Sequence, residues 1–547
     1  MTAREKSASF DSIMAKRKNA SQAKVKVLFV TSEHAPFAKL GGLGEVMFSL
    51  PRALKDIGHD ARVIIPRYGT IDPVKYDLKI EQRGLLVPTG YAGDDKPKEL
   101  ICNVLRYDAT NDPKSPVTTY FLENQEYYEF RSNAYGYGDD HIRFALLSRG
   151  TMEFLKNSGG WVPDVIVCTD WVSALLPSIM KFEYQAIPNF SHIATVLSVH
   201  NLAYQGTAKH HKFTPEMERD DGYGPLPDFF DERMKKINPL RRGIMYADVI
   251  NTVSPKYAEE ITTEEFGEGL EKLFQERHDR LWGILNGIDY TTNNPATDPS
   301  LAKNFTVATL QDRSENKLAL QQRFGLPQNK DVFLMSIASR LAKQKGFGLV
   351  KEVIEPFLRD TRSQLIIVGS GDTELMLYFQ ELEKKYLDQV RADLHFTQSP
   401  HLIFAGTDVV LLPSKYEPSG LVQMEAMRYG AIPVARRVGG LADTVEDYSP
   451  VTKKGGGFLF SEFDAISFLI ALTRAWVNWR HRFSWKKLQT TAMSKDFSWE
   501  HSAESYAKLF RRAIELRKKD REKEAPPERA KEAGAKKTKQ VTKSGGL

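Results

Sequence analysis

The sequence has little cysteine and no long apolar run. Cys102 and Cys168 are its two cysteines among 547 residues. Both lie in apolar stretches, which indicates a reducing compartment with no disulfide framework and no cysteine metal cluster. No apolar stretch reaches about 18 residues, the length that suggests a membrane-crossing helix. We therefore expect no membrane span and a cytoplasmic location, or the plastid stroma if the source is a plant or alga.

The chain also lacks a basic folded region, although its formal net charge is +6. Residues 1–24 and 521–547 each contribute +4, so the residues between them carry −2. This distribution argues against a nucleic-acid-binding domain. Both ends are polar and have little to bury, so we interpret them as a disordered N-terminal extension and a disordered basic tail. The first of them lacks the apolar segment of a secretory signal.

From residue 25 onward, short apolar runs such as "VKVLFV" and "DVIVCTD" alternate with amphipathic stretches, and a second series begins at "VFLMSIASRL". This rhythm predicts parallel sheets covered by helices. The fold class is therefore α/β, with two doubly wound Rossmann-like domains facing a central cleft. We expect the first domain over residues 25–260 and the second over 261–495. A helix over 496–520 packs on the nearest core or crosses back to the first domain.

A glycine loop, "FAKLGGLGEV", follows the first predicted strand and opens a helix. Such a loop is either only a tight turn or an anion site, in which the backbone amides of Gly41 and Gly42 and the helix dipole point at the anion. Lys39 adds a positive charge that suits phosphate. Glu33 and Glu45 flank the loop, and the spacing does not match the dinucleotide fingerprint.

The second series of strands has its own charged ends. "SRLAKQKG" places Arg340 and Lys345 just after a strand, where two crowded cations call for an anion such as phosphate. "RVGGLADTV" sets glycines ahead of a helix start, which predicts a second anion cradle made by Gly439 and Gly440.

"PSKYEPSGLVQMEAMRYG" places Glu417 in a loop and Glu425 on the helix that follows. One carboxylate would then lie near a sugar ring and the other near a ribose hydroxyl, or both are ordinary surface glutamates.

Polar residues also follow the later strands of the first series. "TDW" contains Asp170, and a single histidine in "VHNLAYQG" is followed at once by groups that bind hydroxyls. A histidine after a buried strand is commonly structural, but this neighbourhood favours a hydroxyl-binding site. The candidates there are His200, Asn201, Tyr204 and Gln205, with Asn251 in "NTVSPKYAEEI".

Taken together, nine segments resemble the bacterial glycogen synthase and plant starch synthase family of retaining GT-B glucosyltransferases. They include "KLGGLGEV", "TDW", "VHNLAYQG", "SRLAKQKGF" and "RYGAIPVARRVGGLADTV", and the resemblance covers roughly residues 24–518. It implies transfer of glucose from a nucleotide sugar, with ADP-glucose expected, to the nonreducing end of an α-1,4-glucan such as glycogen or starch. It also implies no cofactor and no metal, an acceptor-side first domain and a nucleotide-sugar second domain. A homo-oligomer is compatible with it.

The resemblance also implies roles for the candidate residues. Arg340 and Lys345 would neutralise the leaving diphosphate, Glu417 would contact the transferred glucose, and His200 and Asp170 would line its pocket. These five are the catalytic candidates. The substrate-binding candidates are Glu33, Lys39, Gly41, Gly42, Glu45, Asn201, Tyr204, Gln205, Asn251, Glu425, Gly439 and Gly440, with the four glycines bringing amides close to donor oxygens.

Four positions depart from the family pattern: Glu45 stands where Asp is usual, Val172 where His or Gln is common, Ser419 where Cys is frequent, and Glu425 where many bacterial members have Tyr. Two alternatives therefore stay open. One is a UDP-glucose-dependent α-glucosyltransferase, and the other is a catalytically weak paralogue that binds glucan as a scaffold.

Overall fold

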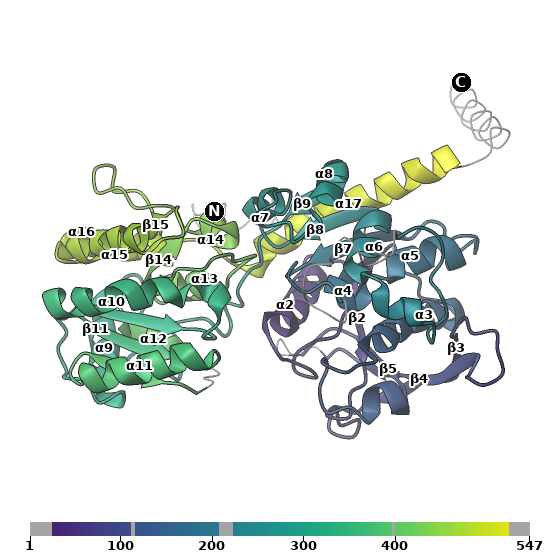
Figure 1. Ribbon diagram of the computed structural model, residues 1–547, viewed down its shortest axis with the longest axis horizontal. Helices are drawn as coiled ribbons and strands as arrows, with labels where there is room; N and C mark the ends of the chain where they lie inside the picture. Colours follow the sequence, from purple (N-terminus) through teal and green to yellow (C-terminus); the bar gives the residue numbers. More distant parts are fainter. Residues whose placement is uncertain (1–23, 111–114, 207–221, 396–399, 525–547) are drawn as a thin grey trace, which may run out of the picture.

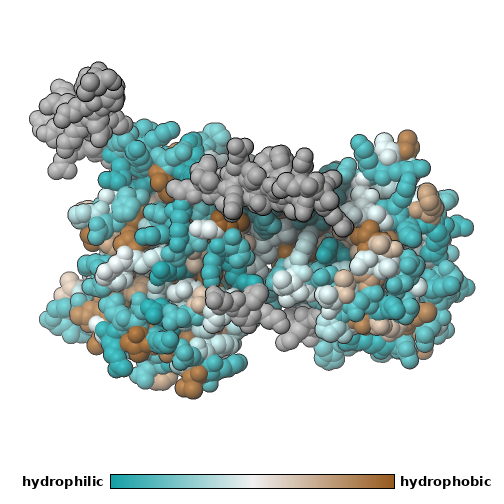
Figure 2. Space-filling model, turned by 180° about the vertical axis from the view of Figure 1, so that it is seen from behind, coloured by the Kyte–Doolittle hydropathy of each residue, from teal (hydrophilic) through white to brown (hydrophobic). Residues whose placement is uncertain are grey.

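The computed structural model describes residues 24–110, 115–206, 222–395 and 400–524. Two α/β domains lie along its long axis (Figure 1). The predicted two-sheet GT-B architecture is confirmed, since each series of apolar runs forms its own parallel-rich sheet. From behind, the surface shows two lobes with a hollow between them (Figure 2).

The first sheet has nine strands in the order β3-β4-β5-β2-β1-β6-β7-β8-β9. Its central strands are buried on both faces, which explains their continuous apolar sequences. Only the pairs β3 with β4 and β4 with β5 are antiparallel within the described sheet. The strands are β1 (Lys26–Val30), β2 (Asp60–Pro66), β3 (Lys79–Pro88), β4 (Glu99–Tyr107), β5 (Thr119–Glu123), β6 (Val165–Thr169), β7 (Ala194–Val199), β8 (Val249–Thr252) and β9 (Leu281–Gly283).

The second sheet has six parallel strands in the order β12-β11-β10-β13-β14-β15. Its topology reverses between β10 and β13, so the loops after these two strands meet at one edge of the sheet. The strands are β10 (Leu334–Ala338), β11 (Gln364–Val368), β12 (Val390–Asp393), β13 (Val409–Leu412), β14 (Ile432–Arg436) and β15 (Phe458–Phe460).

Helices cover both faces of each sheet (Figure 1). Those of the first domain are α2 (Gly42–Asp56), α3 (Asp140–Asn157), α4 (Asp170–Ser173), α5 (Leu176–Ile179), α6 (Pro239–Tyr246), α7 (Pro255–Glu260) and α8 (Glu271–Glu276). Those of the second are α9 (Arg313–Arg323), α10 (Phe347–Thr361), α11 (Thr373–Lys385), α12 (His401–Gly406), α13 (Val422–Arg428), α14 (Gly439–Thr444), α15 (Ala465–Trp479) and α16 (Arg482–Met493). Within the described residues, no helix combines the length and apolar character needed to cross a membrane.

The last helix, α17 (Trp499–Glu524), returns to the first domain. Figure 1 shows it in yellow, running from the junction across that domain. Ala503, Tyr506, Phe510 and Ala513 belong to the core beneath β1, where Phe510 meets the ring of Phe29 at 6.4 Å between centroids. Of the two arrangements expected for this segment, crossing back is therefore confirmed.

The first sheet continues past the predicted domain boundary at residue 260. β9 pairs with β8 through Leu281, Trp282 and Gly283. The segment that follows meets the approach to α17, because Ile288 N–H donates to the Phe497 carbonyl at 2.8 Å. We propose that the first domain extends through Gly283 and takes in α17.

Replacing Phe510 by alanine should destabilise the first domain by about 3–5 kcal/mol, the usual cost of deleting a buried phenyl ring. The side chain is 0% exposed and fills the core between α17 and β1. Urea titration, with hydrogen exchange in β1 as its readout, measures the change in the free energy of unfolding. The exposed Lys508→Ala on the same helix should stay within about 0.5 kcal/mol, and equal effects of the two would show that α17 does not stabilise this core.

Candidate active site

Lys345 and Glu417 lie together at the edge of the second sheet. Lys345 ends a short turn, η6 (Lys343–Lys345), after β10, and Glu417 lies in the loop after β13. Lys345 Nζ is 2.6 Å from Glu417 Oε2, and the Ser414 hydroxyl donates to the same oxygen at 3.0 Å. Glu417 is only 8% exposed. The structure thus joins the predicted cation and carboxylate in one partly buried pair.

Gly346 allows the two loops to approach this closely. Its φ is +71°, and a Cβ there would lie 1.8 Å from the Pro413 carbonyl oxygen. Lys415 N–H also donates to the Gln344 carbonyl at 2.8 Å. Gly346 and this backbone hydrogen bond therefore fix the position of Lys345 through close contact between the two loops.

Arg340 lies on the same edge and is exposed. It forms no ion pair with a carboxylate of the described chain, whereas Lys345 is paired with Glu417. Its charge lowers the pKa of Tyr416, although burial raises that pKa to about 12 overall. Arg340 thus supplies a positive charge beside the pair of Lys345 and Glu417.

The backbone amides of Gly439 and Gly440, which are predicted to bind an anion, donate to groups of the chain itself. Gly439 N–H donates to the Glu260 carboxylate at 3.0 and 3.1 Å, and Gly440 N–H donates to the carbonyls of Glu417 and Pro418. A Cβ on Gly439 would lie 2.1 Å from the Glu417 carbonyl oxygen. These glycines let α14 pack against the Glu417 loop, and a glutamate of the first domain fills the predicted anion cradle.

The loop at Gly41 likewise donates backbone N–H groups to a carboxylate of the chain. Glu33 Oε2 accepts the N–H groups of Leu40 at 2.7 Å and Gly41 at 3.0 Å, while the Tyr135 hydroxyl donates to Oε1 at 2.8 Å. Glu33 is 5% exposed. The anion held by this loop is therefore the chain's own carboxylate.

Lys39 and Glu45 form an exposed ion pair with each other beside the start of α2. Gly42 is the first residue of that helix and is exposed. The negative charge of Glu45 raises the pKa of Glu425 and the positive charge of Lys39 lowers it, while burial, the largest effect, raises it to about 7. Glu425 of the second domain thus lies near the glycine loop of the first.

Asp170 and His200 lie together at the carboxyl ends of β6 and β7. Asp170 Oδ1 accepts the N–H groups of His200 at 2.7 Å and Asn201 at 3.1 Å. Its φ of +46° is uncommon for a residue with a side chain. Burial lowers the pKa of His200 to about 4, so the imidazole is neutral at pH 7. Ser198 Oγ lies 3.2 Å from His200 Nε2.

Two predicted substrate-binding side chains form hydrogen bonds with other residues of the chain. Asn251 is 0% exposed and accepts from Ser198 Oγ at 2.6 Å. Gln205 accepts from Asn238 at 2.6 Å and donates to the Glu268 carbonyl at 3.0 Å. Tyr204 remains 45% exposed. Val172, at one of the departures from the family pattern, is buried in α4.

Asn201, another predicted substrate-binding residue, closes a short turn, in which its side-chain Oδ1 accepts Ala203 N–H at 3.1 Å.

Sequence reasoning missed the contacts that join the domains. Ser254 Oγ donates to Asp443 Oδ2 at 2.5 Å, and Lys256 N–H donates to the same oxygen at 3.0 Å. Glu260 adds its bond to Gly439. The motifs "NTVSPKYAEEI" and "GGLADTV" contain all these residues, but no spacing indicates that they meet.

Known proteins resemble this chain in sequence and in fold. The family described as starch synthase catalytic domain matches residues 26–276, and glycosyl transferases group 1 matches residues 318–487. A glycogen synthase of Clostridium novyi is 39% identical over 492 residues, covering 89% of this chain and 98% of the relative. The chain belongs to the glycogen and starch synthase family.

Other members of this family and more distant folds are also similar. A glycogen synthase of Thermotoga maritima is 38% identical, covering 90% of this chain and 99% of the relative. The catalytic domain of starch synthase IV from Arabidopsis thaliana, solved bound to ADP and acarbose, has a TM-score of 0.76 and 32% identity, covering 90% and 100% of the two chains. Sucrose-phosphate synthase from Thermosynechococcus elongatus, at 16% identity, covers 89% and 99% with a TM-score of 0.55 and shows the fold alone.

Asp170→Asn should change how stability depends on pH. Burial, the largest effect, raises the pKa of Asp170 to about 7, and the negative charge of Glu33 also raises it. The hydrogen bonds from the backbone N–H groups of His200 and Asn201 lower this pKa. Between about pH 4 and 7 the folded wild type keeps a proton that the unfolded chain has released, so its free energy of unfolding falls as pH rises. The amide does not titrate and can still accept both N–H groups.

The stability of Asp170→Asn relative to wild type should therefore rise over this interval, by an amount on the order of a few kcal/mol, and level off above it. Urea unfolding at pH 5, 6, 7 and 8 measures this difference. Asp170→Ala, which loses both hydrogen bonds, should be less stable than Asp170→Asn at every pH. A difference that falls with pH would contradict the assignment of a buried carboxyl whose neutral form is favoured.

Proposed function

We propose that the chain transfers glucose from ADP-glucose to the nonreducing end of an α-1,4-glucan with retention of configuration. The observation that supports this most strongly is the partly buried pair of Lys345 and Glu417 with Arg340 beside it. Membership of the family, relatives named glycogen synthase, and a similar structure bound to ADP and acarbose support the donor and the acceptor class.

The negative charge that develops on the leaving diphosphate explains why two cations, Arg340 and Lys345, lie at this site. When the bond from glucose C1 to the nucleoside diphosphate breaks, the leaving phosphate gains negative charge. Fixed positive groups stabilise that charge without reorganising during the step. We assign this role to Arg340 and Lys345. The ion pair with Glu417 holds the Lys345 ammonium in place, which is the preorganisation that such stabilisation needs.

Glu417 has a second oxygen for the sugar. Lys345 and Ser414 both contact Oε2, while none of the described residues donates a hydrogen bond to Oε1. A carboxylate oxygen accepts hydrogen bonds strongly from hydroxyl groups. We therefore assign Oε1 of Glu417 to the hydroxyls of the transferred glucose.

The first domain would complete the glucose site with uncharged groups. His200 is neutral at pH 7, so its ring can exchange hydrogen bonds with a hydroxyl without adding charge. Asp170 orients the backbone of His200 and Asn201 through its two hydrogen bonds. We propose that the glucan 4-hydroxyl oxygen attacks C1 from the face of the departing diphosphate, which takes the hydroxyl proton, so that configuration is retained.

Lys345→Gln and Glu417→Gln should each lower kcat by about 10²–10³-fold, the range seen when one stabilising group is removed. Release of nucleoside diphosphate from ADP-glucose with glycogen as acceptor measures this rate. Lys384→Gln, on the exposed side of α11, is the matched control and should keep the wild-type rate.

The same assay with UDP-glucose tests the donor. Turnover with UDP-glucose alone would contradict the proposed donor and keep the chemistry. Unchanged rates in both site variants would contradict the assigned site. Binding of glycogen without turnover of either donor would favour a scaffold.

A further inference from the structure

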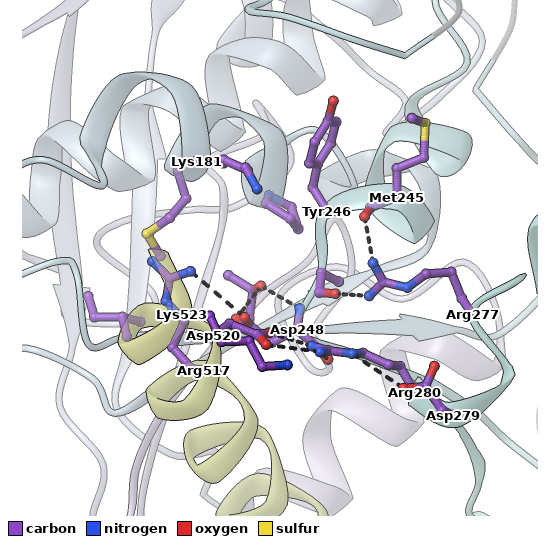
Figure 3. A pocket seen from close by; sticks show the side chains of 15 residues that line it. Lys181, Met245, Tyr246, Asp248, Arg277, Asp279, Arg280, Arg517, Asp520 and Lys523 are labelled. Carbon is purple, nitrogen blue, oxygen red and sulfur yellow. Dashed lines mark hydrogen bonds and ion pairs between the residues drawn. The ribbon is translucent and has the colours of Figure 1, made fainter. Parts of the chain in front are cut away.

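A cavity of about 360 Å³ lies in the first domain, away from the candidate active site. Ile193 and Thr195 at the start of β7 and Asp248 just before β8 form its floor. His200 follows the other end of β7, so the two sites lie at opposite edges of the sheet. Figure 3 shows side chains from α17, from the segment after α8 and from the end of α6 surrounding the cavity.

Positive charge exceeds negative charge in the cavity wall. Five cationic and three acidic side chains line it, and in Figure 3 they reach in from different sides. They are Lys181, Arg277, Arg280, Arg517 and Lys523, with Asp248, Asp279 and Asp520.

The acidic side chains already have partners. The two carboxylate oxygens of Asp520 accept from Nη1 and Nη2 of Arg280, at 2.8 and 3.2 Å. Asp248 Oδ2 accepts from the N–H and hydroxyl of Thr195 at 2.7 and 3.0 Å. Asp279 is 66% exposed and lies 3.9 Å from Arg280. Among the described residues, none of these carboxylates forms an ion pair with Arg277 or Lys523, and Asp248 comes no closer to Arg517 than 3.9 Å.

Arg277 is held by neutral groups instead. Its two terminal nitrogens donate to the carbonyls of Met245 at 2.7 Å and Ala247 at 2.5 Å, at the end of α6. Among the described residues, no carboxylate forms an ion pair with it, and its Nε has no acceptor. The carbonyls orient the guanidinium but leave its charge unbalanced.

Arg517 and Lys523 bring further positive charge from α17. Arg517 Nη1 is 3.9 Å from Asp248 Oδ1, and its buried Nη2 has no acceptor in the described chain. Lys523 is exposed at the rim and pairs with no described carboxylate. Because Arg517 is only 9% exposed, an Nη2 group without an acceptor is costly there, and a ligand oxygen could accept from it.

We propose that this cavity binds a phosphate monoester, either inorganic phosphate or a sugar phosphate. Guanidinium groups match the oxygens of phosphate, and a lysine adds a point charge at the rim. The cavity is larger than phosphate alone needs and leaves room for an attached sugar. A bound phosphate would connect Arg277 with Arg517 and Lys523, and so fasten the end of α17 to the first domain. The proposal does not depend on the proposed function.

Calorimetric titration of inorganic phosphate into the full chain, with ADP in excess to occupy the candidate active site, tests the proposal. We expect one saturable site, at least tenfold weaker in Arg277→Gln. Arg233→Gln removes a 74% exposed arginine elsewhere in this domain and should bind like wild type. No saturable binding in the presence of ADP, or equal affinity in Arg277→Gln and wild type, would overturn the proposal.

A second variant guards against misfolding of the first. Lys523→Gln changes an exposed side chain at the rim and should weaken phosphate binding several-fold, while an unchanged affinity would count against the site. Hydrogen exchange over residues 517–523 should slow when phosphate is added.

Glucose 1-phosphate distinguishes the two sources of the phosphate group. Tighter binding than inorganic phosphate assigns the site to a sugar phosphate, and equal or weaker binding assigns it to the free ion.

Discussion

Backbone N–H groups at the start of a helix need acceptors, and in this protein glutamates of the chain supply them at both glycine loops. Glu33 takes the amide of Gly41, and Glu260 takes the amide of Gly439 from across the domain junction. A buried donor without an acceptor would cost about 1–3 kcal/mol. Because Glu260 belongs to the first domain and Gly439 to the second, their hydrogen bond favours one placement of the domains. Ser254 and Lys256 reinforce that placement by donating to Asp443.

This junction is continuous with the candidate active site. Gly440 N–H donates to the Glu417 carbonyl, and the side chain of Glu417 holds Lys345. On the other side, α17 contributes Tyr506, which lies near Asn251 and Ser198, and burial raises its pKa to about 12. Ser198 in turn lies 3.2 Å from His200 Nε2. The side chains assigned to the sugar are thus supported by the same contacts that position the domains.

The sheets and most of the strand-end candidates could be predicted because both depend on local signals. Apolar runs mark the parallel strands; Asp170 stands directly after one of them, and Glu417 lies in the loop that follows another. The use of each amide could not be predicted, since a glycine motif does not reveal whether a distant carboxylate will reach it, as Glu260 does. Nor does the motif that contains Asn251 reveal that its side chain is buried and accepts a hydrogen bond from Ser198.

A crystal structure of the protein with ADP and a maltooligosaccharide tests the central claim most directly, namely that the edge of the second sheet around Lys345 and Glu417 is the glucosyl-transfer site. The account predicts the diphosphate within hydrogen-bond distance of Arg340 and Lys345, and the nonreducing end of the sugar facing Glu417 and His200. A diphosphate bound away from both cations, or a glucan end remote from Glu417, would contradict it.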